Sequence, residues 1–182
     1  YKEALEYNPK DADTYVALIS TLLRLNRLKE ALDYNLTFVE IANTNYVSYM
    51  LLAKVYYELY DDQRAYEAIN KAFNLNRGDL EEYLIEIKIY LRNRAYEPAL
   101  DEINFLKENG LKDNVDVLIL DGLYLSKQKD KKQEAIDILK EAIDRLDNNE
   151  PSILAIDCYH QYLSLAIGTR LNIDKAKELK VN

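Results

Sequence analysis

A spacing of 34 residues recurs along this chain and constrains its fold more than any other feature. Three columns of residues share the spacing: Leu22, Tyr56, Tyr90 and Tyr124; Tyr15, Tyr49 and Tyr83; and Ala31, Ala65 and Ala99. Because one period is common to three columns, the sequence predicts a repeat array rather than a single irregular domain. A repeat unit cannot bury its apolar face alone, so neighbouring units must stack and leave a long surface available for binding.

Each period has the pattern of two helices joined by a turn. In the segment 12–45, apolar residues at helical spacing lie on both sides of the polar pair Asn26 and Arg27. Apolar residues three and four positions apart predict amphipathic helices, and the polar pair predicts a short turn between them. The chain of 182 residues has only 4 Gly and 3 Pro, which favours helices over strands joined by tight turns.

The repeat resembles the tetratricopeptide repeat, a 34-residue helical hairpin with a signature of aromatic, leucine and small residues. The match extends over almost the whole chain, and its fullest copy is Tyr49, Leu52, Ala53, Tyr56, Ala65 and Ala72. The resemblance implies an all-α, right-handed superhelical solenoid of antiparallel helix pairs, forming one repeat domain over 1–182. We expect the end of a truncated repeat at 1–11, repeats at 12–45, 46–79, 80–113 and 114–149, and a divergent last repeat at 150–182.

The register of the repeat breaks after Asp147. The motif resumes about seven residues late, which predicts a first helix from Pro151 to about Ile167 and a short second helix from Asp174. At both ends we expect apolar side chains that are open to water, namely Leu5, Ile173 and Leu179. Such faces predict either end-to-end self-association or further residues that flank this sequence.

The charge balance argues against nucleic acid as a partner. The formal net charge is −8, and such a chain repels a phosphate backbone unless its positive charge is segregated. The one basic run is Lys127, Lys129, Lys131 and Lys132. We interpret it as a solvated turn, because Asp130 interrupts it and no aromatic residues alternate with it. No apolar run approaches the roughly 18 residues of a membrane span.

No residue cluster predicts catalysis, a metal site or a cofactor. Cys158 is the only cysteine and His160 the only histidine, and residues two apart on a helix face different ways. We therefore expect neither a metal site nor a nucleophile, and interpret His160 as the aromatic position of the last repeat. A single cysteine excludes an intrachain disulfide and favours a reducing compartment such as the cytoplasm.

Three polar residues occupy positions that are predicted to be buried or to lie inside a helix. Glu86 replaces a leucine and Asp121 a small residue, and we interpret both as satisfied polar contacts rather than a catalytic pair. Asn35 begins a glycosylation sequon, but it lies inside a predicted helix, so we do not expect it to be modified.

The resemblance also predicts a binding surface, since in this family the concave face is lined by the first helices. The matching stripe consists of Val16, Ser20, Leu23, Met50, Lys54, Tyr57, Leu84, Lys88, Leu91, Leu118, Gly122 and Leu125. The stripe has three residues from each first helix, with apolar residues at both ends and a small or basic residue at the centre. This pattern predicts a groove for a peptide with apolar anchors and an acidic residue that meets Lys54 and Lys88. The alternative is that Leu23, Tyr57 and Leu91 belong partly to the core and that the lysines are merely solvated.

The resemblance does not extend to one activity found in the family. A subtype holds the C-terminal carboxylate of a chaperone with Lys, Asn and Arg side chains. Here the corresponding positions carry Val16, Ser20, Leu51, Glu81 and Ile85. The leading hypothesis is therefore a non-catalytic adaptor that binds a partner protein of unknown identity. The alternative is a regulatory or substrate-positioning arm of a larger enzyme or co-chaperone whose active domain lies outside this sequence.

Overall fold

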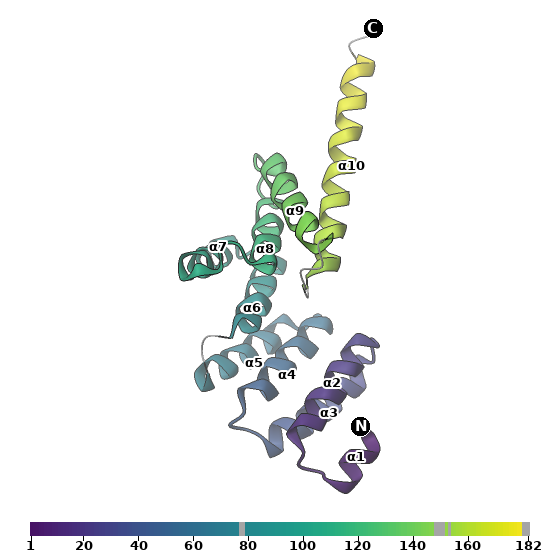
Figure 1. The fold of residues 1–182 in the computed structure, drawn as a ribbon, viewed down its shortest axis with the longest axis vertical. Helices are drawn as coiled ribbons and strands as arrows, with labels where there is room; N and C mark the ends of the chain where they lie inside the picture. The colour runs from purple at the N-terminus through teal and green to yellow at the C-terminus, as the bar shows by residue number, and fades with distance from the viewer. Residues whose placement is uncertain (77–78, 148–151, 153, 180–182) are drawn as a thin grey trace. The chain divides into compact units, whose positions relative to one another are not determined.

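The computed structural model describes residues 1–76, 79–147, 152 and 154–179, and these parts are helical with no strand (Figure 1). The helices are α1 (Lys2–Tyr7), α2 (Ala12–Arg24), α3 (Leu28–Ile41), α4 (Tyr46–Glu58), α5 (Asp62–Leu75), α6 (Leu80–Arg92), α7 (Tyr96–Leu106), the π-helix η1 (Lys107–Leu111), α8 (Val115–Leu125), α9 (Lys132–Asp147) and α10 (Ala155–Leu179). The predictions of an all-α fold and of helix pairs are confirmed. None of the described helices is both long enough and apolar enough to cross a lipid bilayer.

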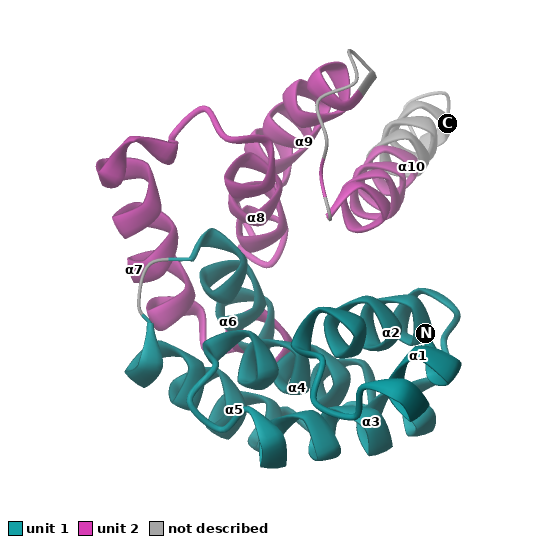
Figure 2. Cartoon of the chain, turned by 60° about the horizontal axis from the view of Figure 1, so that its bottom comes forward, with its two compact units in different colours: residues 1–89 teal, residues 90–182 magenta. Residues whose placement is uncertain are grey.

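The chain divides into two compact units, Tyr1–Ile89 and Tyr90–Asn182 (Figure 2). In the first unit, α4 lies between α2 and the part of α6 that belongs to this unit, and α3 and α5 lie on the other side (Figure 2). That one repeat domain extends over the whole chain remains a prediction.

Small residues and aromatics form the core of the first unit. Ala53, Ala65 and Ala72 are fully buried in one cluster, where their missing side chains let the helix backbones approach closely. In the neighbouring cluster the rings of Tyr15 and Phe38 stack at 5.3 Å. The predicted burial of Ala65 is confirmed, as is that of Ala99 in the second unit. Leu5 is only 8% exposed within the neighbouring cluster, so the expectation that it is open to water is wrong.

A residue in the left-handed backbone conformation ends the first helix of three successive pairs. These residues, Asn26, Tyr60 and Arg94, have φ values of 55°, 62° and 60° and again stand 34 apart. One residue further on, the backbone N–H donates to the carbonyl five positions earlier, as from Asp61 to Tyr56 at 3.0 Å. This bond closes a Schellman motif and satisfies a carbonyl that the helix end leaves unpaired.

One additional residue precedes α8 in the second unit. Gly110 has φ 88° within η1, and the N-cap Asn114 lies 35 residues after Asp79, which accepts a hydrogen bond from the backbone N–H of Glu81 at the start of α6. The small position of this repeat is consequently Gly122, where a Cβ would lie 2.6 Å from Cγ of Leu139. The prediction that Asp121 occupies the small position is therefore wrong, and so is the placement of Gly122 in the groove.

The last helix differs from its prediction. α10 is continuous from Ala155 to Leu179, so the expected break between Ile167 and Asp174 is absent. A lone Gly168 costs a helix only about 1 kcal/mol, which is too little to end it. Pro151 and the side chains of Ile173 and Leu179 lie outside the described residues.

Cys158 and His160, both near the start of α10, face opposite ways. Cys158 is fully buried, and its thiol donates to the carbonyl of Leu139 at 3.6 Å. His160 is exposed, so its interpretation as a core aromatic is wrong. Burial, followed by the charge of Asp157, raises the pKa of the Cys158 thiol to about 11. The thiol is therefore protonated at neutral pH and is a poor nucleophile or metal ligand.

Candidate peptide-binding surface

The predicted stripe divides into accessible and buried members. Partly exposed residues are Val16, Ser20, Leu23, Lys54, Tyr57 and Lys88, all in the first unit. Buried residues are Met50, Leu84, Leu91, Leu118 and Leu125. The last three belong to the second unit. The side chains that a ligand could reach are therefore those of α2, α4 and α6 in the first unit.

The basic centre of the stripe is held by an acidic partner. Nζ of Lys54 on α4 forms a short ion pair with Oε1 of Glu81 in the first turn of α6. Both side chains are only partly exposed, so solvent screens this pair less than a fully exposed one. Lys54 therefore contributes little net positive charge to the surface, and an acidic ligand group must compete with Glu81 for it.

A second contact joins the same two helices. Nζ of Lys88 on α6 lies 5.0 Å from the ring centroid of Tyr57 on α4. An ammonium over an aromatic face is attracted by the negative potential of the ring. Together with the ion pair of Lys54 and Glu81, this contact fixes two points of the seam between α4 and α6.

The accessible apolar side chains are also partly structural. Val16 and Leu23 pack against the cluster around Phe38, and Tyr57 packs against the cluster around Ala65. Each contributes one side to the core and another to the surface. Such anchoring limits the rotamers that a ligand would otherwise have to order.

A buried acidic group lies on α6 and was not predicted. Glu82 is fully buried, and neither of its carboxylate oxygens has a hydrogen-bond partner in the described part of the chain. Burial raises its pKa to about 7, and the charges of Asp79 and Glu86 act in the same direction. One feature of the sequence could have indicated this burial: Glu82 lies 34 residues after Ser48, which is also buried.

Asp79 and Asp121 both make polar contacts. The hydroxyl of Tyr46 donates to Asp79 at 3.3 Å, and the charge of Asp79 raises the pKa of Tyr46. Among the described residues no group of acids, histidine or cysteine could hold a metal ion. Two other acids are buried, Glu86 on α6 and Asp121 in the second unit. Asp121 accepts from Nζ of Lys107 at 2.6 Å, which confirms its interpretation as a satisfied polar contact.

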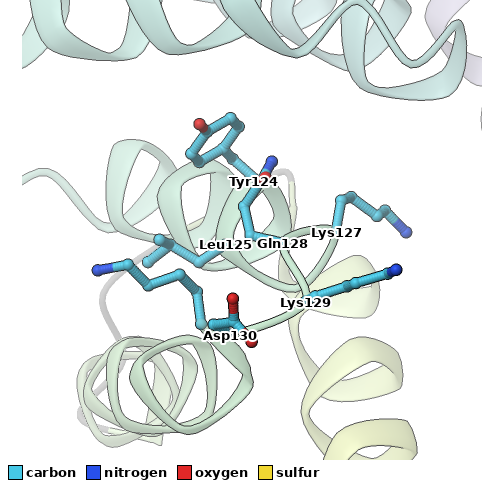
Figure 3. A pocket seen from close by; sticks show the side chains of 7 residues that line it. Tyr124, Leu125, Lys127, Gln128, Lys129 and Asp130 are labelled. Carbon is cyan, nitrogen blue, oxygen red and sulfur yellow. The ribbon is translucent and has the colours of Figure 1, made fainter.

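A hollow of about 540 Å³ lies at the turn between α8 and α9 (Figure 3). It is lined by Tyr124, Leu125, Lys127, Gln128, Lys129, Asp130 and Lys131. This turn contains the basic run of the sequence. It lacks the left-handed residue that ends the first helices of the three earlier pairs, since Ser126 has φ −60°.

Several solved structures superpose on this chain. TTC0263, a thermophilic TPR protein of Thermus thermophilus, is 21% identical, with 91% of this chain and 87% of that chain covered and a TM-score of 0.72. YrrB, described as a TPR protein with an unusual peptide-binding site, is 16% identical, with 93% and 83% covered and a TM-score of 0.59. MamA is 19% identical, with 82% and 86% covered and a TM-score of 0.63. No protein-family model and no curated protein matches the sequence.

Proposed function

We propose that this chain, which has the fold of tetratricopeptide-repeat proteins, is a non-catalytic scaffold that binds a segment of a partner protein. The binding surface is the face of α2, α4 and α6 in the first unit, with Val16, Leu23 and Tyr57 as its apolar part. The observation that carries the proposal is the half-exposed Tyr57, which is anchored in the core on one side and contacted by Lys88 on the other. The peptide-binding site named for YrrB supports it as an analogy of fold.

The charges of the surface define the partner more closely. Lys54 is matched by Glu81 and Lys88 lies on Tyr57, so the surface holds little uncompensated positive charge. Apolar anchors of the partner should therefore supply most of the affinity, and its charges should mainly affect the rate of association. A segment with one or two large apolar side chains fits this surface better than a strongly acidic one.

The test is capture of a partner by the intact protein, followed by measurement of affinity for variants. Tyr57→Ala should weaken binding by about 2 kcal/mol, roughly 30-fold, if Tyr57 is a hot spot. Tyr66→Ala, on α5, is the matched control and should bind like the wild type. Circular dichroism must show that each variant is folded.

A second variant separates binding from packing, because Tyr57 also contacts the core. Lys88→Glu leaves the apolar side chains of this face in place and should slow association with an acidic partner. If Tyr57→Ala and Lys88→Glu both bind with wild-type affinity and rate, the partner does not use this face.

A further inference from the structure

The turn between α8 and α9 is built differently from the corresponding turns after α2, α4 and α6. In those three turns a left-handed residue and a Schellman hydrogen bond close the chain tightly. Here the backbone N–H groups of Lys127 and Gln128 instead donate to Tyr124 and Leu125 at 3.0 Å. The chain then continues to α9 at Lys132. The longer path leaves the hollow of Figure 3 between the end of α8 and the start of α9.

The polar groups that line this hollow are mainly uncommitted donors. Lys131 donates to Glu134 at 2.6 Å, whereas Lys127 and Lys129 have no acidic partner in the described part of the chain. Both extend to the same side in the view of Figure 3. The amide nitrogen of Gln128 is buried and has no hydrogen-bond partner there. An ammonium has three donors and no acceptor, so the lining needs oxygen acceptors from elsewhere.

The lining of this hollow is positively charged, whereas the chain as a whole is negatively charged. Since Lys131 is paired with Glu134, the remaining Lys127, Lys129 and Asp130 give the lining a net charge of about +1, while the whole chain has −8. A solvated turn does not require a hollow, and it does not require a buried amide donor without a partner, because such a donor costs free energy when left unpaired. These features distinguish the turn from the solvated one that the sequence suggested.

We propose that this hollow binds an acidic segment of a partner protein, with carboxylates placed on Lys127 and Lys129. A carboxylate carries the charge and the two acceptor oxygens that the free ammoniums lack. Tyr124 and Leu125 give the hollow a small apolar wall that suits an aliphatic side chain next to the acids. Nucleic acid fits less well, because only one aromatic ring is available for stacking and the chain is acidic. The hollow belongs to the second unit, whereas the face around Tyr57 belongs to the first.

The probe is a fluorescein-labelled peptide in which pairs of glutamates flank a leucine, titrated against the full chain by anisotropy at low and high salt. The double variant Lys127→Glu/Lys129→Glu should bind at least 10-fold more weakly and lose most of the salt dependence. Lys140→Glu, on α9 and outside the hollow, is the charge control and should change affinity less than 2-fold. The same peptide with glutamine for glutamate should not bind.

Two further variants distinguish this site from general attraction between charges and from the face around Tyr57. Gln128→Leu removes the unpartnered donor, so it should weaken binding several-fold without lowering the melting temperature. Tyr57→Ala should leave binding of this peptide unchanged, so the two surfaces can fail independently. The proposal is overturned if the glutamate peptide does not bind, or if Lys140→Glu weakens it as much as the double variant. It is also overturned if single-stranded DNA of equal charge binds more tightly and responds to the same substitutions.

Discussion

At the scale of single residues, the three turns of positive φ show where the repeat stores strain. An asparagine tolerates the left-handed region at Asn26, but Tyr60 and Arg94 carry large side chains there. Tyr60 is 81% exposed, so its replacement loses little burial. Tyr60→Gly should exceed Tyr60→Ala in free energy of unfolding by about 1 kcal/mol, because only glycine adopts this φ without strain. Urea denaturation of the two variants measures the difference, and equal midpoints would contradict the strain.

Glu82 gives a second prediction at this scale. Its pKa is about 7 in the folded chain and 4.5 ordinarily, so the folded state binds this proton more tightly than the unfolded state. The stability that the neutral carboxyl provides is present below pH 4.5 and is lost as the pH rises through 7. Glu82→Gln cannot ionise and should therefore be more stable than the wild type at pH 8, by at most about 3 kcal/mol.

The comparison for Glu82 is made at two pH values. At pH 4 the two proteins should differ little, and the gap should open between pH 4.5 and 7 in denaturant titrations. Glu97→Gln, at an exposed position on α7, should show no such gap. A Glu82→Gln difference that is the same at pH 4 and pH 8 would mean that the carboxyl does not titrate in this range.

At the scale of helices, Gly122 on α8 tests how α8 and α9 pack, and Gly168 on α10 is the comparison. A Cβ at Gly122 would lie 2.6 Å from Cγ of the fully buried Leu139, whereas one at Gly168 meets nothing within 4 Å. Gly122→Ala should therefore destabilise the chain by about 1–2 kcal/mol after the gain in helix propensity. Gly168→Ala should stabilise it by about 0.5–1 kcal/mol. Thermal unfolding decides, and an equal gain from both substitutions would place Gly122 away from the crossing.

The sequence predicts these helices better than it predicts their side-chain partners. The 34-residue period locates the pairs from α2 to α7, since small and aromatic residues recur at every crossing. It fails at Gly110, where one added residue moves the small position from Asp121 to Gly122. The ion pair of Lys54 and Glu81 joins residues 27 apart, and only the stacking of α4 on α6 brings them together. The sequence could therefore predict which helices form the binding face, but not how the charges on that face are paired.

At the scale of the whole molecule, repeat proteins are stabilised mainly by contacts between neighbouring repeats, so damage to one repeat should remain local. Ala65 is fully buried in the first unit. Ala65→Leu should overpack the helix crossing at this position and lower the free energy of unfolding by about 1–3 kcal/mol. Hydrogen exchange should then accelerate in α4 and α5 while α8 and α9 keep wild-type protection. Gly122→Ala is the reciprocal variant and should accelerate exchange in α8 and α9 alone. Equal acceleration in all four helices from either substitution would show that the chain unfolds as one cooperative unit.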